Sequence, residues 1–541
     1  MLLPFVASAQ FSVSGKVTNQ TGETLPGATI TITNPALSTV ADASGAYNFA
    51  NLGSAVYTLK VSYIGYQQAS KTVNVAANQV VNFTLSAGNV TTEEVTITAT
   101  RAGKNSPTAF SNLSKKDIEK NNFGQDLPYL LNQTPSVVVS SDAGAGVGYT
   151  GIRIRGSDPS RINVTINGIP YNDSESQGSF FVDIPDIASS VNNIQVQRGV
   201  GTSTNGAGAF GGSINIQTAT RRDTAYAELN NSAGSYNTVK NTVSIGTGLL
   251  GNHFSFDGRL SRVHSDGYID RAFSNLRSYF VSGAYYGKNT TLRANIFTGY
   301  ERTYQAWNGV PDYEIQNNRR YNEYTYKDQV DNYTQNHYQL LLDQRLSDKL
   351  SFSGALHYTK GNGYYEEFRE ADSVKNYGLT PVVYNGQTIY TTDLVRRRWL
   401  DNDFYGVTYA LKYLPSEKLN LSLGGAYNIY DGAHFGQIIQ SKESIGVGPE
   451  HEYYRDNAKK KDFNIFARGE LTLGDVILYA DMQYRNIDYS FLGFDRNLNN
   501  VQQNAKLNFF NPKAGITYKI DERNSVYASF AVGNREPNRD D

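Results

Sequence analysis

Four short segments decide the fold: GIRIRG at 151–156, INVTINGIP at 162–170, NIQVQRG at 193–199 and GAGAFGGSINIQT at 206–218. Each alternates apolar, often β-branched residues with polar ones, which is the period-two pattern of a β-strand. Glycines bound the segments, as expected where strands end in tight turns. Together they predict a domain with a β-sheet over about a hundred residues.

A helix is expected before these strands. Ser114 to Asp117 reads SKKD, a capping-box pattern that opens a helix. Leu127, Leu130 and Leu131 follow at the spacing of one apolar helix face. With the strands, they predict an α+β domain over residues 106–220.

In order and spacing, these elements resemble the plug domain of TonB-dependent outer-membrane receptors. That family shows a Thr-Pro-x-Val turn after the helix, present here at 134–137, and then four strands. The strands carry Ile-Arg-Gly, Asp/Asn-Gly-x-Pro, Val-x-Arg-Gly and Gly-Gly-x-Ile-Asn-Ile, and all occur here. The alternative for the glycine-rich run 199–212 is a phosphate loop, which we reject because Gly-Lys-Ser/Thr is absent and no helix pattern follows. The resemblance implies an energy-coupled importer in the bacterial outer membrane.

Residues 221–541 predict an antiparallel transmembrane β-barrel. Segments of roughly ten residues alternate strongly, as in lipid-facing strands, although a soluble sandwich also alternates. Short turns are expected at 347–349, 415–417, 474–475 and 521–523, and long polar excursions near 302–331, 361–401 and 431–461. Short turns on one side and long loops on the other are typical of outer-membrane barrels.

The number of predicted strands is smaller than that of a complete plugged barrel. The pattern predicts roughly thirteen strands, whereas plugged transporters use about 22. The last residues, 538–541, are polar, and an open sheet edge cannot lie in lipid. We therefore expect a truncated barrel lacking about the last third, with a naturally short barrel as the alternative.

The N-terminal part predicts a small β-sandwich at 10–88. Short alternating runs and turn residues divide it, and its pattern resembles the carboxypeptidase-regulatory-like domain. Residues 1–9 end in Ala7-Ser8-Ala9, a small-x-small pattern typical of the tail of a secretory signal. The whole chain is thus expected to be dominated by β-structure.

A linker at 89–105 contains a β-prone segment. Such a segment can add to the edge of a partner's sheet through main-chain hydrogen bonds. It resembles a TonB box, which implies the periplasmic TonB protein as partner. The TonB-binding residues are then Glu94, Val95, Thr96, Ile97, Thr98 and Ala99.

Composition excludes several other classes. The net charge of −1 argues against a nucleic-acid binder, and the absence of Cys excludes disulfides and thiolate sites. No stretch reaches the roughly 18 apolar residues of a transmembrane helix, so contact with outer-membrane lipid requires a barrel. The six His show no metal-ligand spacing, and we find no nucleophile, general base or cofactor loop. We expect no catalytic residue, no metal site, no cofactor and no enzyme activity.

Three charged residues are candidates for holding the plug. By resemblance, Arg155 and Arg198 in the two Arg-Gly motifs would face inward barrel carboxylates, with Glu470 as one partner. A charge in the lumen needs a partner or water, which gives the idea a physical basis. The alternative is that both arginines only satisfy plug carbonyls.

Ligand contacts are expected at the plug apices and in the long loops. Segments 177–181 and 304–311 resemble ferric-citrate-type receptors, whereas Asn205 stands where many siderophore receptors carry Tyr. The candidate contacts are Arg161, Gln177, Phe180, Asn205, Tyr304, Trp307 and Asn308. Arginines in or beside the loops are further candidates to attract an anionic iron chelate: Arg302, Arg319, Arg320, Arg396, Arg397 and Arg398.

Three functions follow from these patterns. The leading hypothesis is import of a ferric siderophore or ferric citrate. The second is uptake of another large solute, an oligosaccharide or cobalamin, although glycan receptors usually carry Asp-Gly where this chain has Asn167-Gly168. The third is a surface adhesion or signalling receptor.

Overall fold

The computed structural model describes residues 10–32, 35–63, 66, 68–86, 101–103, 105–203, 206, 210–218, 221–521 and 523–538. Contacts divide the chain into two units, residues 1–94 and 95–541. The segment expected to bind TonB, residues 94–99, lies outside the described residues.

The first unit is the expected small β-sandwich. Its strands are β1 (Phe11–Asn19), β2 (Thr29–Ile32), β3 (Leu37–Val40), β4 (Ala46–Leu52), β5 (Ala55–Ser62), β6 (Ala69–Val75), β7 (Gln79–Val80) and β8 (Phe83–Leu85). One sheet has the order β3-β2-β5-β6, and the other has β4-β1-β7 with β8 beside β1. Inward residues of both sheets, among them Ile30, Leu59 and Phe83, form one core, which is what stabilises a sandwich.

The second unit begins with the plug. It contains β9 (Ala109–Ser114), α1 (Lys115–Asn121), α2 (Leu127–Leu130), β10 (Val137–Ser141), β11 (Thr150–Ile154), β12 (Ile162–Ile166), β13 (Ile169–Pro170), β14 (Val191–Arg198) and β15 (Gly212–Thr218), with 3-10 turns η1 (Pro159–Arg161), η2 (Phe181–Asp183) and η3 (Ile187–Ser190). The main sheet has the order β13-β12-β15-β14-β9, with β12 and β15 parallel. The capping box at Ser114 and Asp117 is present as predicted. The last strand begins at Gly212 and not at 206.

One plug strand departs from the expected alternation. Every residue of β12 is buried, including the polar Asn163 and Thr165. The strand pattern predicts one buried face, but this strand lies between β13 and β15 in a sheet that the barrel strands surround. The buried hydroxyl of Thr165 is satisfied because it donates a hydrogen bond to Asn215 Oδ1 at 3.0 Å.

The remaining strands form one antiparallel sheet of thirteen strands, as predicted, with β16 and β30 at its edges. They are β16 (Tyr226–Gly234), β17 (Thr238–Gly246), β18 (Phe254–Ser265), β19 (Ser274–Tyr286), β20 (Thr290–Tyr304), β21 (Val330–Arg345), β22 (Leu350–Ser373), β25 (Thr391–Ser416), β26 (Leu419–Ser441), β27 (His451–Leu473), β28 (Val476–Gly493), β29 (Gln503–Lys519) and β30 (Ser525–Ala531). Loops between them carry α3 (Asp312–Ile315), η4 (Val374–Tyr377) and the hairpin β23 (Val382–Tyr384) and β24 (Gln387–Ile389).

Two of the predicted long excursions are mostly strand. β22 and β25 have 24 and 26 residues, so the excursion expected at 361–401 shrinks to 374–390. That expected at 431–461 shrinks to 442–450. About ten residues suffice to cross a bilayer. In β25 the excess includes residues 396–398 and 401–403, which are polar on both faces of the strand, so the apolar–polar alternation that identifies a membrane strand is lost there.

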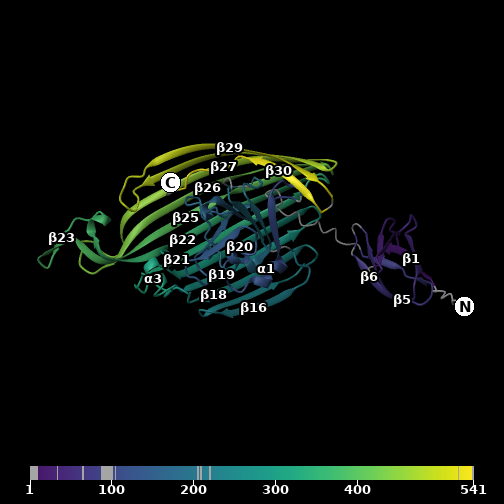
Figure 1. Cartoon of the computed structure of the whole chain (residues 1–541), viewed down its shortest axis with the longest axis horizontal. Helices are drawn as coiled ribbons and strands as arrows, with labels where there is room; N and C mark the ends of the chain where they lie inside the picture. Colours follow the sequence, from purple (N-terminus) through teal and green to yellow (C-terminus); the bar gives the residue numbers. More distant parts are fainter. Residues whose placement is uncertain are drawn as a thin grey trace. The chain divides into compact units, whose positions relative to one another are not determined.

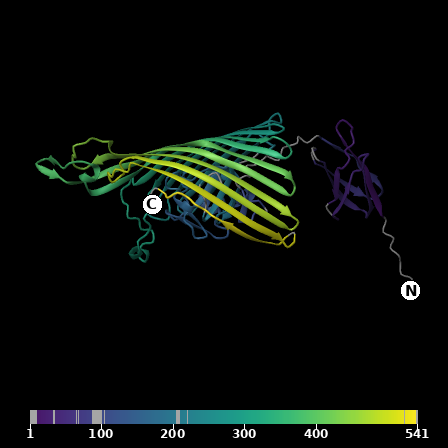
Figure 2. The same ribbon diagram turned by 90° about the horizontal axis from the view of Figure 1, so that it is seen from above.

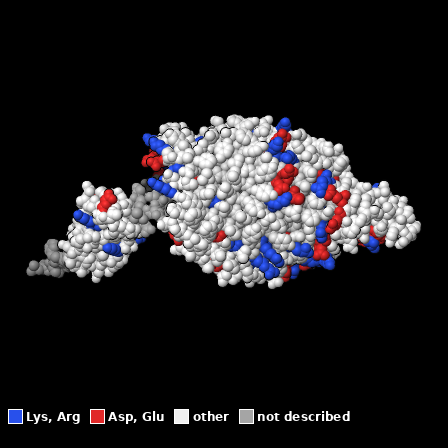
Figure 3. Space-filling model, turned by 180° about the vertical axis from the view of Figure 1, so that it is seen from behind, with Lys and Arg blue, Asp and Glu red and all other residues white. Residues whose placement is uncertain are grey.

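The sheet curves around the plug (Figures 1 and 2). Plug residues form hydrogen bonds to inward side chains of strands from β17 to β29, such as Lys240 at one end and Lys513 at the other. The outer face carries exposed apolar side chains such as Leu421, Met482 and Ile516. Figure 3 shows a broad area of this face with few charged residues, bordered by charged ones, as expected of a lipid-facing band.

Candidate functional site

A cavity of about 250 Å³ lies between the plug and the inner wall of the sheet. The plug contributes Pro170 at the end of β13 and the following loop, residues 171–176, together with Tyr149, Phe180 and Asp183. The wall contributes side chains of β20, β21, β22, β25 and β26: Glu301, Asp331, Tyr333, His337, Tyr364, Tyr365, Arg398, Asn402, Phe404, Tyr430 and His434. We call this space the apical cavity. Segments far apart in the sequence therefore build one site.

Three carboxyl groups lie along one side of the apical cavity; those of Asp183 and Glu301 are buried, and that of Asp331 is half-buried. Asp183 comes from η2, Glu301 from β20 and Asp331 from β21. The Tyr149 hydroxyl donates to Asp331 at 2.6 Å and lies 3.4 Å from Glu301. Burial, and then the neighbouring charge of Asp331, raise the pKa of Asp183 well above its usual range. This side of the cavity therefore favours positive charge or bound protons.

The loop at the plug apex is fixed to the wall through Glu175. Its buried carboxylate accepts hydrogen bonds from Tyr430 at 2.7 Å and from Tyr489 at 2.9 Å. His434 Nε2 lies 2.9 Å from the same group, while its Nδ1 lies 2.9 Å from Asp456. A histidine between two carboxylates donates from both nitrogens when it is protonated. The loop is thus held by one acid and three wall side chains.

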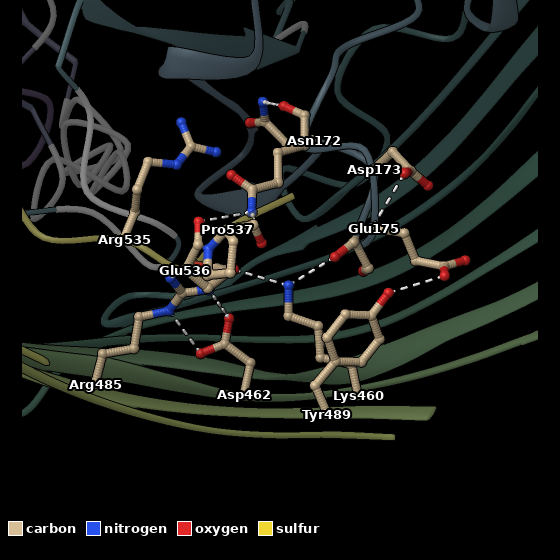
Figure 4. A network of polar contacts seen from close by, with 12 residues as sticks. Asn172, Asp173, Glu175, Lys460, Asp462, Arg485, Tyr489, Arg535, Glu536 and Pro537 are labelled. Carbon is tan, nitrogen blue, oxygen red and sulfur yellow. Dashed lines mark hydrogen bonds and ion pairs between the residues drawn. The ribbon is translucent and has the colours of Figure 1, made fainter. Parts of the chain in front are cut away.

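The segment after β30 reaches the same loop (Figure 4). Glu536 is buried and pairs with Lys460 at 2.8 Å and with Arg485. Despite its burial, the charges of Arg485 and Lys460 hold the pKa of Glu536 well below its usual range. Gln177 donates to the backbone oxygens of Glu536 and Pro537, at 3.2 and 3.1 Å. Residues 532–538 therefore bridge the plug loop and the wall.

The plug is held separately through Asp186, which follows η2. Its carboxylate lies 2.7 Å from Lys240 Nζ and 3.2 Å from Arg259, and all three side chains are almost fully buried. Thr242 and Ser261 each donate to it at 2.7 Å. Together, Arg259 and Lys240 hold the pKa of Asp186 well below its usual range, which burial alone would raise.

Three family models match the sequence. They are a CarboxypepD_reg-like domain over residues 13–97, a TonB-dependent receptor plug domain over 102–213 and a TonB-dependent-receptor-like β-barrel over 278–541. The chain belongs to the TonB-dependent receptor family. As a member it is an outer-membrane protein whose barrel strands cross the bilayer. None of the curated proteins matches the sequence.

Solved structures share the receptor's fold. The ferric-catecholate import receptor Fiu from E. coli K12 aligns at 15% identity and a TM-score of 0.58, over 80% of this chain and 70% of Fiu. The ferric citrate transporter FecA aligns at 15% and 0.60, over 79% and 62%. The siderophore receptor PiuA from Acinetobacter baumannii aligns at 16% and 0.58, over 79% and 64%. The chain thus spans less than two thirds of FecA and PiuA.

The structure places the predicted plug-holding residues apart. Arg155 and Arg198 line one pocket near Gly199, whereas Glu470 lines another and accepts a hydrogen bond from Ser106 at 2.9 Å. Among the described residues, neither arginine forms an ion pair with Glu470. The buried ion pairs at Asp186 have the opposite polarity, because the plug supplies the acid and the barrel supplies the cations Lys240 and Arg259.

The predicted ligand contacts divide into two groups. Phe180 lines the apical cavity, and Trp307 packs edge-on against the lining residues Tyr149 and Tyr365, with ring centroids 5.6 and 5.5 Å away. The others lie elsewhere. Arg161 pairs with Asp158, Gln177 binds residues 536–537, Tyr304 donates to the backbone of Tyr324 and Tyr326, and Asn308 contacts Glu323 and Tyr324. Asn205 is outside the described residues.

Most loop arginines already have partners. Arg302 pairs with Asp328, Arg320 with Asp270, Arg397 with Glu366, and both Arg396 and Arg398 with Glu367. Each such pair cancels most of the field that would attract an anion. The positive loop surface expected from the sequence is therefore largely neutralised.

Sequence reasoning missed the cavity's acids, Asp183, Glu301 and Asp331. Each is a single carboxylate in an ordinary strand or turn, and no motif surrounds them. Only the curvature of the sheet brings them together. Among the described residues, no group of three or more His, Asp or Glu is arranged to hold a metal ion. No helix in the described part of the chain is long and apolar enough to cross a membrane.

Proposed function

We propose that the receptor imports a large solute, an iron chelate, with energy supplied through TonB. The observation that carries the proposal is the apical cavity, which the plug and the barrel wall build jointly. A solute bound there contacts both parts, so plug movement would change its affinity. The names of the similar structures, which are ferric-catecholate, siderophore and ferric citrate receptors, support iron as the cargo. We propose no enzymatic activity.

Energy coupling would run through residues 94–99. TonB pairs with this segment as an added strand, and force transmitted to the plug breaks the contacts that hold it. The contacts of Asp186 and Glu175 with the barrel are among those that such a movement has to break or carry along.

The test is uptake by a receptor-deficient host. Cells expressing the receptor take up labelled ferric chelates, and a Val95→Pro variant keeps surface binding but loses uptake, because proline removes the amide that strand pairing needs. Asn89→Pro, in the same linker but outside the motif, is the control and retains uptake. Equal uptake by wild type and Val95→Pro would contradict energy coupling.

A second candidate is a neutral oligosaccharide. The aromatic walls of the apical cavity would stack on sugar rings, and the nearby carboxyl and amide groups would bind hydroxyls. Uptake of labelled oligosaccharides without uptake of any iron chelate would favour it.

A further inference from the structure

The lining of the apical cavity is strongly biased in charge. Five carboxyl groups face it: Asp173, Glu175, Asp183, Glu301 and Asp331. Glu175 is matched by His434, but among the described residues no lysine or arginine pairs with Asp183, Glu301 or Asp331. Arg398 is the one described lysine or arginine in the lining, and it already donates to Tyr365 at 3.0 Å and lies 3.9 Å from Glu367.

Aromatic side chains form much of the rest of the wall. Tyr149, Tyr171 and Phe180 come from the plug, and five more come from the barrel: Tyr333, Tyr364, Tyr365, Phe404 and Tyr430. Aromatic faces attract cations and stack on planar groups. The residues available to a ligand therefore combine negative charge with ring faces.

We propose that the apical cavity selects a solute that carries positive charge together with planar or apolar groups, and discriminates against polyanions such as ferric citrate. This inference rests on the proposed function, since it concerns the charge of the imported solute. The arrangement of acids and aromatic rings in the lining supports this charge selectivity. An anion in this space would face carboxyl groups that lack cations, whereas a cation would meet both the acids and the aromatic faces.

Protonation follows from the same arrangement. The groups that face Asp183 are Glu301, Asp331 and Asp173, with the hydroxyls of Tyr149, Tyr171 and Tyr333. Because its pKa is raised, Asp183 stays protonated in the empty cavity up to a higher pH than an ordinary aspartate does. An arriving cation favours the carboxylate and releases that proton, so cation affinity rises with pH.

The first experiment needs no knowledge of the ligand. Trp307 lies against two lining tyrosines, and Trp399→Phe makes it the single tryptophan, because the chain has two. Fluorescence of the purified receptor is quenched with caesium and with iodide at pH 8. Relative to free tryptophan, we expect caesium to quench several-fold better than iodide. Asp331→Asn should reduce the ratio of caesium quenching to iodide quenching. Asp328→Asn, which alters an acid outside the cavity paired with Arg302, should not.

The second experiment uses ferrioxamine B, whose ferric complex carries a free ammonium group, with its N-acetyl and N-succinyl derivatives. These share one chelate and differ in charge. We expect the ammonium form to bind at least about tenfold more tightly than the succinyl form, and Asp183→Asn to narrow the difference while the acetyl form changes little.

The outcomes separate the two proposals. Iodide quenching as efficient as caesium quenching, or succinyl binding as tight as ammonium binding, would overturn the charge selectivity. A preference for caesium without binding or uptake of any iron chelate would support the charge selectivity and remove iron chelates as the cargo.

Discussion

Asp183 and Asp186 lie three residues apart in the plug and have opposite surroundings. Asp186 pairs with Lys240 and Arg259 and accepts hydrogen bonds from hydroxyls, so its charge is fully matched. Asp183 lies among Glu301, Asp331 and Tyr149, and the described residues give it no cation. The difference indicates separate roles: Asp186 holds the plug in the barrel, and Asp183 leaves a carboxyl group without a cation where a solute can bind.

The largest expected effect is loss of the Asp186 anchor. Asp186→Asn preserves the left-handed backbone, at φ 52°, because asparagine adopts this conformation readily, but leaves two buried cations unpaired. We expect the plug to lose about 3–5 kcal/mol of stability, measured by hydrogen exchange of plug peptides. Asp158→Asn, in an exposed plug pair with Arg161, should cost under about 1 kcal/mol. Equal effects would show that Asp186 does not anchor the plug.

Asp126 is a third buried carboxyl group of the plug, and the pH dependence of plug stability tests its protonation state. Burial raises the pKa of Asp126 to about 8, although Thr150 donates to it at 3.1 Å. Because the folded pKa lies above the unfolded value, the stabilisation present at low pH is lost as pH rises to about 8. Asp126→Asn should match wild type in stability near pH 4 and exceed it by about 3 kcal/mol at pH 6, and the excess should grow until the pH passes about 8. Parallel pH profiles of plug hydrogen exchange would contradict this.

The smallest effect is expected at the apex loop. Glu175→Gln keeps an acceptor for Tyr430 or Tyr489 but removes the charge beside His434. We expect faster hydrogen exchange in residues 171–180, corresponding to about 1 kcal/mol, with no change elsewhere in the plug. Glu119→Gln, on exposed α1, serves as control. An unchanged loop would mean that Glu175 does not hold it.

The sequence predicts architecture better than the site. Period-two alternation and turn residues predicted the sandwich, the plug and the thirteen strands, because these patterns are local. The sequence did not predict the polar ends of β22 and β25, because a polar stretch of strand has the composition of a loop. The ion pair of Asp186 with Lys240 and Arg259 joins residues more than fifty positions apart, and only the curvature of the sheet around the plug brings them together.

The most direct test of transport by plug movement is a reversible tether. A Cβ built on Gly148 would lie 3.6 Å from that of Ser274 on β19, within the range of a disulfide, and the chain has no cysteine of its own. Uptake is measured in cells carrying Gly148→Cys and Ser274→Cys together, with Gly148→Cys alone as control for strain at its positive φ. We predict that oxidation blocks uptake while surface binding persists, and that a reductant restores uptake. Undiminished uptake by the oxidised pair would contradict the proposal that the plug moves relative to this strand.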